Sequence, residues 1–280
     1  KNKEDIKNYN TIFLTIDTPL TLDGRPKVEK IISTLKQAVN FIKKNSNLII
    51  TSQVYCGFCD DLKKTILKNR PDINLIYLAE TLIMGNALDR FLFPERIILG
   101  HDKKIKFIKI FKKFNCQIYN FSLREAEMVK IAINLFLFSS VSYANAMDYY
   151  CRQFGFKFSR INGALRSDKR IGKLSYISPS LGVSGGHLER DVFTMIKTSK
   201  SPEVKNLFKN LKKVNDSRML LLIKKYEDLR KQFKFKKIIW FGPSYKNNSF
   251  SINNSPFIKF RKYLKNRKKV LYSFDSYFDL

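Results

Sequence analysis

The first hundred residues alternate between continuous apolar runs and segments of helical periodicity. Apolar runs at residues 10–19, 47–51, 73–78 and 96–100 have the length and composition of buried strands. A helix is predicted after residue 26, where apolar positions recur at helical spacing, and a second helix over residues 60–68. This order of strands and helices predicts a parallel sheet with crossover helices.

The middle of the chain has a helical pattern instead. The sequence Ser122-Leu123-Arg124-Glu125 is a capping box that opens a long predicted helix, which Gly155 ends. More helical sequence follows, interrupted by a loop over residues 178–186, and another helix is predicted over residues 203–232. A strand, a helix and a strand return within residues 237–246, 256–265 and 269–275. The organisation is therefore α/β, then all-α, then α/β.

Composition restricts the class of protein. Lys and Arg number 53 against 24 Asp and Glu, a net charge of +29 that attracts polyanions. The lysines are spread along the whole chain and no nucleic-acid-binding motif occurs, so nucleic acid is not the expected ligand. The longest apolar run, residues 131–147, is too short and too polar to span a bilayer. Four cysteines in 280 residues fit a reducing compartment, and a cytoplasmic location is expected.

Two of those cysteines form a separate candidate site. Cys56-Gly57-Phe58-Cys59 follows an apolar strand and precedes a lysine-rich helical pattern, an order typical of thioredoxin-like redox sites. A thioredoxin fold would need its own small four-stranded sheet, which nothing downstream supplies. A thiol at the start of a helix can still have a lowered pKa, so Cys59 remains a candidate reactive thiol without a redox function.

Eight short stretches, in order, resemble the UDP-glucose/GDP-mannose dehydrogenase family, NAD-dependent enzymes with two Rossmann-like domains joined by a helical dimerising domain. These are 18-TP-19, 52-SQVYCGF-58, 79-AETLIMGNA-87, 94-PERIILG-100, 126-AEMVKIAIN-134, 168-DKRIG-172, 182-GVSGGHLERD-191 and 241-FGPSYK-246. The resemblance covers nearly the whole chain. It implies an α/β fold of two incomplete Rossmann-like parallel-sheet domains bridged by an all-α dimerisation domain.

The same resemblance implies the domain boundaries and the ligands. The domains are expected at residues 1–117, 118–215 and 216–280, with NAD as cofactor, a UDP- or GDP-sugar as substrate and a homodimer formed through the helical domain. The family's Gly-x-Gly-x-x-Gly motif, which binds the pyrophosphate of NAD at a helix N-terminus, does not occur. The chain is therefore expected to begin partway through the first domain and to stop before the last strands of the third.

Five positions are implied to be catalytic. Lys130 and Asn134 are four residues apart, hence on one face of one helix, and their ammonium and amide suit the stabilisation of an alkoxide. Spacing alone favours a surface lysine beside a packing asparagine, and the resemblance to the family reverses this preference. Glu80 matches the glutamate that helps to hydrolyse the family's thioester, and Asp191 matches its acid–base aspartate. His187 stands where the family has its catalytic cysteine, four residues before Asp191.

The remaining implied positions bind ligands, and several depart from the family pattern. Those near NAD are Thr18, Pro19 and Gln53, those near the nucleotide sugar are Gly182, Gly185, Gly186 and Lys246, and no metal is implied. Gln53 replaces a threonine, Met84 stands where many members have a second glutamate, and Asn253 replaces an arginine. Imidazole cannot form the hemithioacetal and thioester that a thiolate forms, so the four-electron oxidation of UDP-glucose is expected to fail.

Three hypotheses follow from these residues. The chain is a divergent nucleotide-sugar dehydrogenase, or a catalytically silent homologue that dimerises and binds a nucleotide sugar or a partner, or a polyanion-binding protein. A steep dependence of DNA retention on salt would distinguish the third.

Overall fold

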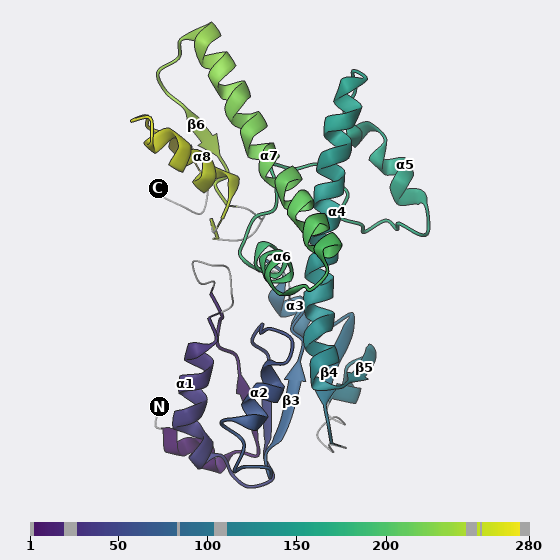
Figure 1. Ribbon diagram of the computed structural model, residues 1–280, viewed down its shortest axis with the longest axis vertical. Helices are drawn as coiled ribbons and strands as arrows, with labels where there is room; N and C mark the ends of the chain where they lie inside the picture. The colour runs from purple at the N-terminus through teal and green to yellow at the C-terminus, as the bar shows by residue number, and fades with distance from the viewer. Residues whose placement is uncertain are drawn as a thin grey trace. The chain divides into compact units, whose positions relative to one another are not determined.

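The computed structural model describes residues 3–19, 27–82, 85–103, 111–244, 251–252 and 254–274, and its contacts divide the chain into two compact units (Figure 1). The first unit is Lys1–Ile133 and the second is Asn134–Leu280. The predicted boundaries at 117/118 and 215/216 stay predictions. Each unit is described by itself below.

The first unit holds a five-stranded sheet in the order β1-β2-β3-β4-β5. Its elements are η1 (Lys3–Asn8), β1 (Thr11–Leu14), α1 (Glu29–Ala38), η2 (Val39–Phe41), β2 (Asn47–Ile50), α2 (Phe58–Lys64), β3 (Asn74–Leu78), α3 (Ala87–Leu92), β4 (Arg96–His101) and β5 (Gln117–Phe121). Strands β1, β2 and β3 are parallel, with Leu14 beside Ile50 and Ile50 beside Tyr77. The predicted α/β class is confirmed.

The sheet departs from the predicted parallel arrangement at one pair. Strand β4 runs antiparallel to β3, with Tyr77 opposite Gly100, while β5 is parallel to β4. A parallel return needs a crossover helix that packs on the sheet. Helix α3 has only six residues and buries none of them, so it does not act as such a crossover.

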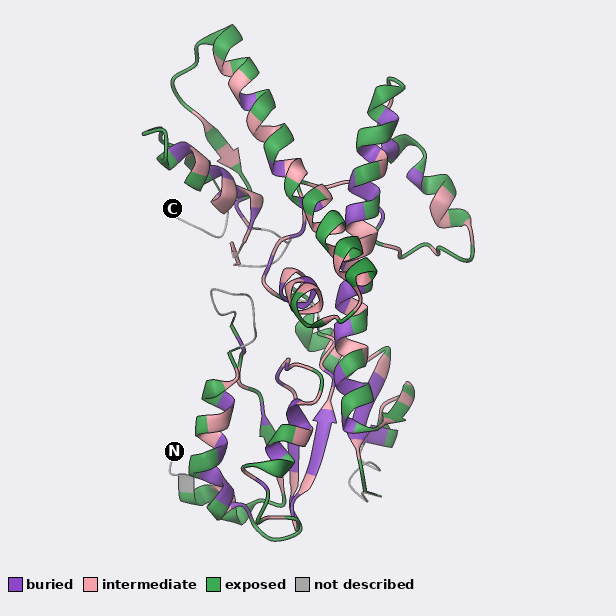
Figure 2. Ribbon diagram, viewed as in Figure 1, coloured by how far each residue is buried: buried purple, intermediate pink, exposed green. Residues whose placement is uncertain are grey.

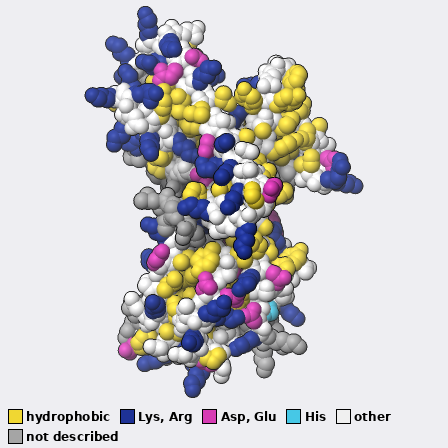
Figure 3. All heavy atoms as spheres, in the orientation of Figure 1, with side chains coloured by type: hydrophobic (Ala, Val, Ile, Leu, Met, Phe, Trp, Pro, Cys, Tyr) yellow, Lys and Arg dark blue, Asp and Glu magenta, His cyan; other side chains and the backbone are white. Residues whose placement is uncertain are grey.

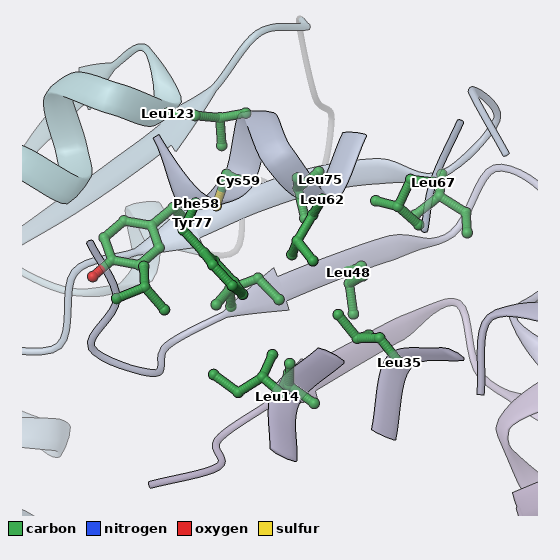
Figure 4. Close-up of a cluster of buried hydrophobic side chains, with 14 of the residues drawn as sticks. Leu14, Leu35, Leu48, Phe58, Cys59, Leu62, Leu67, Leu75, Tyr77 and Leu123 are labelled. Carbon is green, nitrogen blue, oxygen red and sulfur yellow. The ribbon is translucent and has the colours of Figure 1, made fainter. Parts of the chain in front are cut away.

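Burial explains why β2 and β3 form the centre of the sheet. Leu48, Ile49 and Ile50 are fully buried on both faces, as expected for a strand covered by helices (Figure 2). On one face, Leu35 of α1 and Phe58 and Leu62 of α2 cluster with Leu48 and Ile50 (Figure 4), whereas Ile49 packs in a second cluster with Ile76 and Leu99. Full burial of each such side chain contributes about 1.5–3 kcal/mol.

The second unit is mainly helical and ends in a small β-α-β element. Helix α4 (Leu123–Gln153) begins in the first unit and continues into the second, and the other elements are η4 (Phe158–Arg160), α5 (Asn162–Ser167), α6 (His187–Thr198), α7 (Pro202–Phe233), β6 (Ile239–Phe241), α8 (Pro256–Lys265) and β7 (Tyr272–Phe274). Strands β6 and β7 are parallel. Residues of α7 and α8 share an apolar cluster that includes Tyr226, Phe260 and Leu264.

Local signals in the sequence set the ends of three helices. The capping box at Ser122 forms, because the Glu125 carboxylate accepts from the backbone N–H of Ser122 at 2.8 Å. Helices α7 and α8 each begin with a serine cap followed by proline, Ser201-Pro202 and Ser255-Pro256. None of the described helices has the length and apolar character needed to cross a membrane.

Candidate active site

A buried asparagine–aspartate pair joins α4 to α6 in the second unit. The Asn134 Nδ2 donates to Asp191 Oδ2 at 2.7 Å, and both residues are 5% exposed. The other carboxylate oxygen accepts from Arg190 Nε at 3.0 Å, and the Arg190 side chain is also buried. Two of the predicted catalytic residues therefore meet, although 57 positions separate them in sequence.

A glycine loop precedes α6 and is held by two buried asparagines. Gly182 has a φ of +103°, and a Cβ there would lie 3.1 Å from the backbone oxygen of Asn215, so glycine is required. The Asn215 Oδ1 accepts from the Val183 N–H at 2.6 Å, and the Asn145 Oδ1 accepts from the Ser180 N–H at 2.8 Å. The backbone of this loop is thereby fixed by α7 and α4.

The end of the same loop is tied to α8 through one carboxylate. Glu189 accepts from Asn254 Nδ2 at 2.6 Å and from Lys259 Nζ at 3.3 Å. The Asn254 amide also donates to the Gly185 carbonyl at 3.1 Å. Gly185 is buried with a φ of +77°, and Gly186 is the N-cap of α6. The three predicted substrate-binding glycines, Gly182, Gly185 and Gly186, thus lie on a loop with a defined backbone.

His187 is the first residue of α6 and is exposed. It lies four residues before Asp191, one turn along the same helix. The second unit contains a single cysteine by sequence, Cys151, whose side chain is buried in a cluster with Phe158 and Ile177. The position that follows the glycine loop therefore carries an imidazole where the resemblance implies a thiol.

The predicted cofactor residues follow the carboxyl ends of the parallel strands in the first unit. Thr18 comes after β1 and its buried hydroxyl donates to the Gln53 carbonyl at 2.6 Å, after β2. The Ser52 hydroxyl donates to the Ile16 carbonyl at 2.6 Å. Pro19 is exposed beside Thr18. These bonds join the loops after β1 and β2 at the edge where α/β sheets bind nucleotides, so the residues present fit a dinucleotide that lies along this edge.

Two further predicted catalytic residues belong to the first unit. Glu80 follows β3 at the same edge, is half-buried, and accepts from the backbone N–H of Leu82. Lys130 lies on α4, half-buried, one turn before Asn134. Lys246, Met84 and Asn253 lie outside the described residues.

Sequence reasoning missed Glu127, which holds the start of α2. Its carboxylate is fully buried and accepts from the backbone N–H groups of Gly57 at 2.5 Å and Cys59 at 2.8 Å. Burial raises the pKa of Glu127 above its ordinary value, although both backbone donors favour the ionised form. These two N–H groups at the start of α2 therefore bind a carboxylate of the chain itself instead of a ligand phosphate. Only its place in the 126-AEMVKIAIN-134 motif could have indicated this residue.

The same carboxylate overturns the expectation of a reactive thiol. Cys59 is fully buried among apolar side chains (Figure 4), and burial together with the Glu127 carboxylate raises its pKa well above the ordinary value. Cys56 is exposed as a residue, but partial desolvation of its thiol and the nearby Glu127 carboxylate raise its pKa as well. The prediction of a lowered pKa at this helix start was wrong, because burial disfavours the thiolate of Cys59 and the Glu127 carboxylate acts against the helix dipole.

The described part of the chain contains no group of three His, Cys, Asp or Glu side chains that could hold a metal ion. A mostly parallel α/β sheet with hydroxyl-bonded loops at its carboxyl edge, followed by a helical unit, is typical of the class of Rossmann-type dehydrogenases that have an attached helical domain.

Comparisons with known proteins specify the family within this class. Residues 1–120 match the NAD binding domain of the UDP-glucose/GDP-mannose dehydrogenase family, and residues 124–217 match its central domain. The chain therefore belongs to the UDP-glucose/GDP-mannose dehydrogenase family, whose cofactor is NAD.

Relatives and solved structures agree with this assignment. The UDP-glucose 6-dehydrogenase YwqF of Bacillus subtilis (strain 168) is 26% identical over 263 residues, which are 91% of this chain and 60% of YwqF. A UDP-glucose 6-dehydrogenase of Campylobacter jejuni is 30% identical over 92% of this chain and 65% of its own length. A solved UDP-glucose dehydrogenase from Pyrobaculum islandicum has the same fold, with a TM-score of 0.86 at 22% identity, covering 98% of this chain and 66% of that one. The chain thus spans about three fifths of the length of YwqF.

Proposed function

We propose that this protein is an NAD-dependent nucleotide-sugar 6-dehydrogenase in which the thiol-dependent second oxidation is lost. The substrate would be a UDP- or GDP-sugar of the UDP-glucose, UDP-N-acetylmannosamine or GDP-mannose type. The observation that carries the proposal is the buried Asn134–Asp191 bond, one helical turn from His187. In this proposal the chain retains the family's acid–base and oxyanion groups and lacks the thiol at the position that follows the glycine loop.

The residues present can support one hydride transfer. NAD, when bound, supplies the acceptor for the hydride from the sugar C6 carbon. The hydroxyl proton must leave to a base, and Asp191 and His187 are the groups of this chain that the proposal assigns to that step. Lys130 and Asn134, one turn apart on α4, would stabilise the developing alkoxide by charge and amide dipole. The product of this step is the C6 aldehyde, NADH and a proton.

The second oxidation requires chemistry that an imidazole does not supply. In the family a cysteine adds to the aldehyde, a second NAD would take the hydride from this adduct to give a thioester and a proton, and water hydrolyses the thioester to the acid and the free thiol. A thiolate is the group that makes such an adduct. We therefore propose that acid formation from the aldehyde is impaired in this chain.

The test uses full-length protein with NAD and each of the three nucleotide sugars. We expect NADH in amounts equal to the aldehyde, trapped as a hydrazone, and no uronate. The His187→Cys variant should form the uronate, whereas His101→Cys, which changes the only other histidine, should not. Uronate formation by the unaltered protein would disprove the loss of the second step.

A second candidate function is a catalytically inactive homologue that dimerises. Besides His187, the exposed aromatic side chains on one face of α4 favour it, since Phe136 is 70% exposed, Tyr143 is 47% and Tyr150 is 54%. An exposed apolar stripe of this kind is suited to a protein partner, here a second copy. The absence of NADH with every sugar, together with a dimer in sedimentation analysis, would support this alternative.

A further inference from the structure

A cavity of about 210 Å³ lies in the first unit at the end of the sheet opposite the candidate cofactor edge. It is lined by residues of the α2 end, the α2–β3 connection, the start of β3 and the residues after β4. Thr18, Gln53 and Glu80 follow the carboxyl ends of β1, β2 and β3, whereas the cavity meets β3 at Asn74, its amino end. A five-residue strand is about 16 Å long, so the two sites are separate.

The floor of the cavity is apolar and the rim is basic. Leu67, Ile73 and Leu75 line it and are between 4% and 6% exposed. Lys63, Lys68 and Lys103 line it as well, against the single carboxylate of Asp102. Such a site attracts an anion and rejects a cation, and the net charge of the whole chain acts in the same direction.

Most of the basic groups around this cavity already have partners. Lys63 forms an ion pair with Asp102, and Lys103 Nζ donates to the Pro71 carbonyl at 2.8 Å. Arg70 is held by Asp72 and by the carbonyls of Val39 and Ile42, at 2.5–3.2 Å.

Lys68 differs from the other basic groups of the rim. Its side chain is exposed and has no hydrogen bond or ion pair to any residue that the structure describes. One uncommitted ammonium group matches one negative charge on a ligand.

The volume limits the size of the ligand. Pockets for drug-sized ligands occupy about 300–1,000 Å³, so a cavity of about 210 Å³ is too small for a nucleotide or a nucleotide sugar. We propose that this cavity binds a small carboxylate with a single aromatic ring, the ring on the Leu67–Ile73–Leu75 floor and the carboxylate at Lys68. This site is independent of the proposed dehydrogenase activity.

Phenylacetate is the probe, titrated into full-length protein with ¹³C-labelled isoleucine and leucine methyl groups. The methyl signals of Leu67, Ile73 and Leu75 should shift saturably. Benzyl alcohol, which has the ring without the charge, and acetate, which has the charge without the ring, should each bind at least about tenfold more weakly.

Charge variants test the role of Lys68. Lys68→Glu should raise the Kd of phenylacetate at least about tenfold, and Lys68→Gln should raise it by a smaller factor. Lys64→Glu makes the same change of net charge on an exposed residue outside the cavity and should leave the Kd within about twofold. The proposal is overturned if the three methyl groups do not shift saturably, or if Lys64→Glu and Lys68→Glu weaken binding equally.

Discussion

At the residue scale, the Asp191 carboxylate depends on donors from two different helices. Asn134 comes from α4 and Arg190 from α6, and all three side chains are buried. A buried carboxylate that loses one donor keeps the full cost of its desolvation. The pair is therefore a structural element of the second unit as well as a candidate catalytic one.

Replacing Asn134 should reveal this cost. We expect Asn134→Ala to lower the free energy of unfolding by about 2 kcal/mol, because the buried Asp191 carboxylate loses the hydrogen bond from the Asn134 amide. The Ser139→Ala variant removes a hydroxyl that only bonds back to Leu135 on the same helix, and it should change stability by less than about 0.5 kcal/mol. Urea unfolding followed by circular dichroism measures both, and equal effects would show that the Asn134–Asp191 bond is energetically unimportant.

The two cysteines near α2 should differ in their access to reagents. With iodoacetamide at neutral pH, Cys56 should be modified first and Cys59 should remain protected, because Cys59 is buried and its thiol pKa is raised. A raised pKa leaves less thiolate at a given pH, so the modification of Cys56 should accelerate as the pH increases. Peptide mass spectrometry after timed quenching gives both rates. Faster modification of Cys59 than of Cys56 would contradict the burial of Glu127 and Cys59.

Whether the role of a single residue could be predicted depended on whether it lies in a recognisable motif or makes contacts with distant parts of the chain. Asn134 and Asp191 were predicted from motifs, and the structure joins them. Glu127 was not predicted as a functional residue, because its role depends on backbone donors about 70 positions away. The pKa of Cys59 was predicted in the wrong direction for the same reason.

At the element scale, Asp148 joins α4 to α7 and to the connection after α4. Its carboxylate accepts from Arg152 at 2.9 Å, Arg218 at 3.1 Å and the Phe158 N–H at 3.3 Å. Burial alone raises the pKa of Asp148, but these donors outweigh it and hold the pKa below its ordinary value of 3.8. The ionised form is thus bound more tightly in the folded state.

This shift gives a pH-dependent stability. The pKa of Asp148 is lower in the folded state than in the unfolded state, so its ionised carboxylate stabilises the folded protein. This contribution is complete above the pKa of the unfolded state, near 3.8, and is lost as the pH falls through the lower pKa of the folded state. At pH 7, the Asp148→Asn substitution should lower the free energy of unfolding by about 3 kcal/mol, because Arg218 loses the buried carboxylate with which it pairs. The difference between the variant and the unaltered protein should shrink below about pH 4. A difference that is constant from pH 7 to pH 3 would contradict the assignment.

The glycine loop provides a second test at this scale. Gly182→Ala should destabilise the protein by about 2 kcal/mol, because an alanine is strained at a φ of +103° and its Cβ would crowd Asn215. Gly163→Ala is the matched control, since Gly163 lies in α5 with nothing within 4 Å of the added Cβ, and it should be neutral or stabilising by up to about 1 kcal/mol. Thermal unfolding compares the two, and equal effects would exclude the proposed strain.

Elements with local signals were predicted well, and elements set by tertiary contacts were not. The predicted capping box at Ser122 marks the start of α4, and the helices predicted over residues 203–232 and 256–265 correspond to α7 and α8. Strand β5 was missed because it is largely exposed and has no continuous apolar run. The antiparallel direction of β4 goes with the lack of a packed crossover helix between β3 and β4, since α3 buries none of its residues, and the apolar pattern of β4 does not reveal this.

At the scale of the whole molecule, basic side chains are scattered over the visible face and acidic ones are fewer (Figure 3). This distribution suits phosphate-bearing ligands in general, so charge alone did not separate a nucleotide sugar from a polyanion. The order of the eight motifs favoured a nucleotide sugar over a polyanion, because membership of a family constrains residues in both units. The net charge of a chain indicates which class of ligand it attracts, whereas the order of its motifs indicates its fold.

The most direct test of the account is the identity of the product that full-length protein forms from UDP-glucose and NAD, measured by mass spectrometry. The account predicts that the unaltered protein, with His187 after its glycine loop, forms no UDP-glucuronate. UDP-glucuronate formed by the unaltered protein with two NADH per sugar would contradict it, because the second oxidation would then proceed without a thiol at this position.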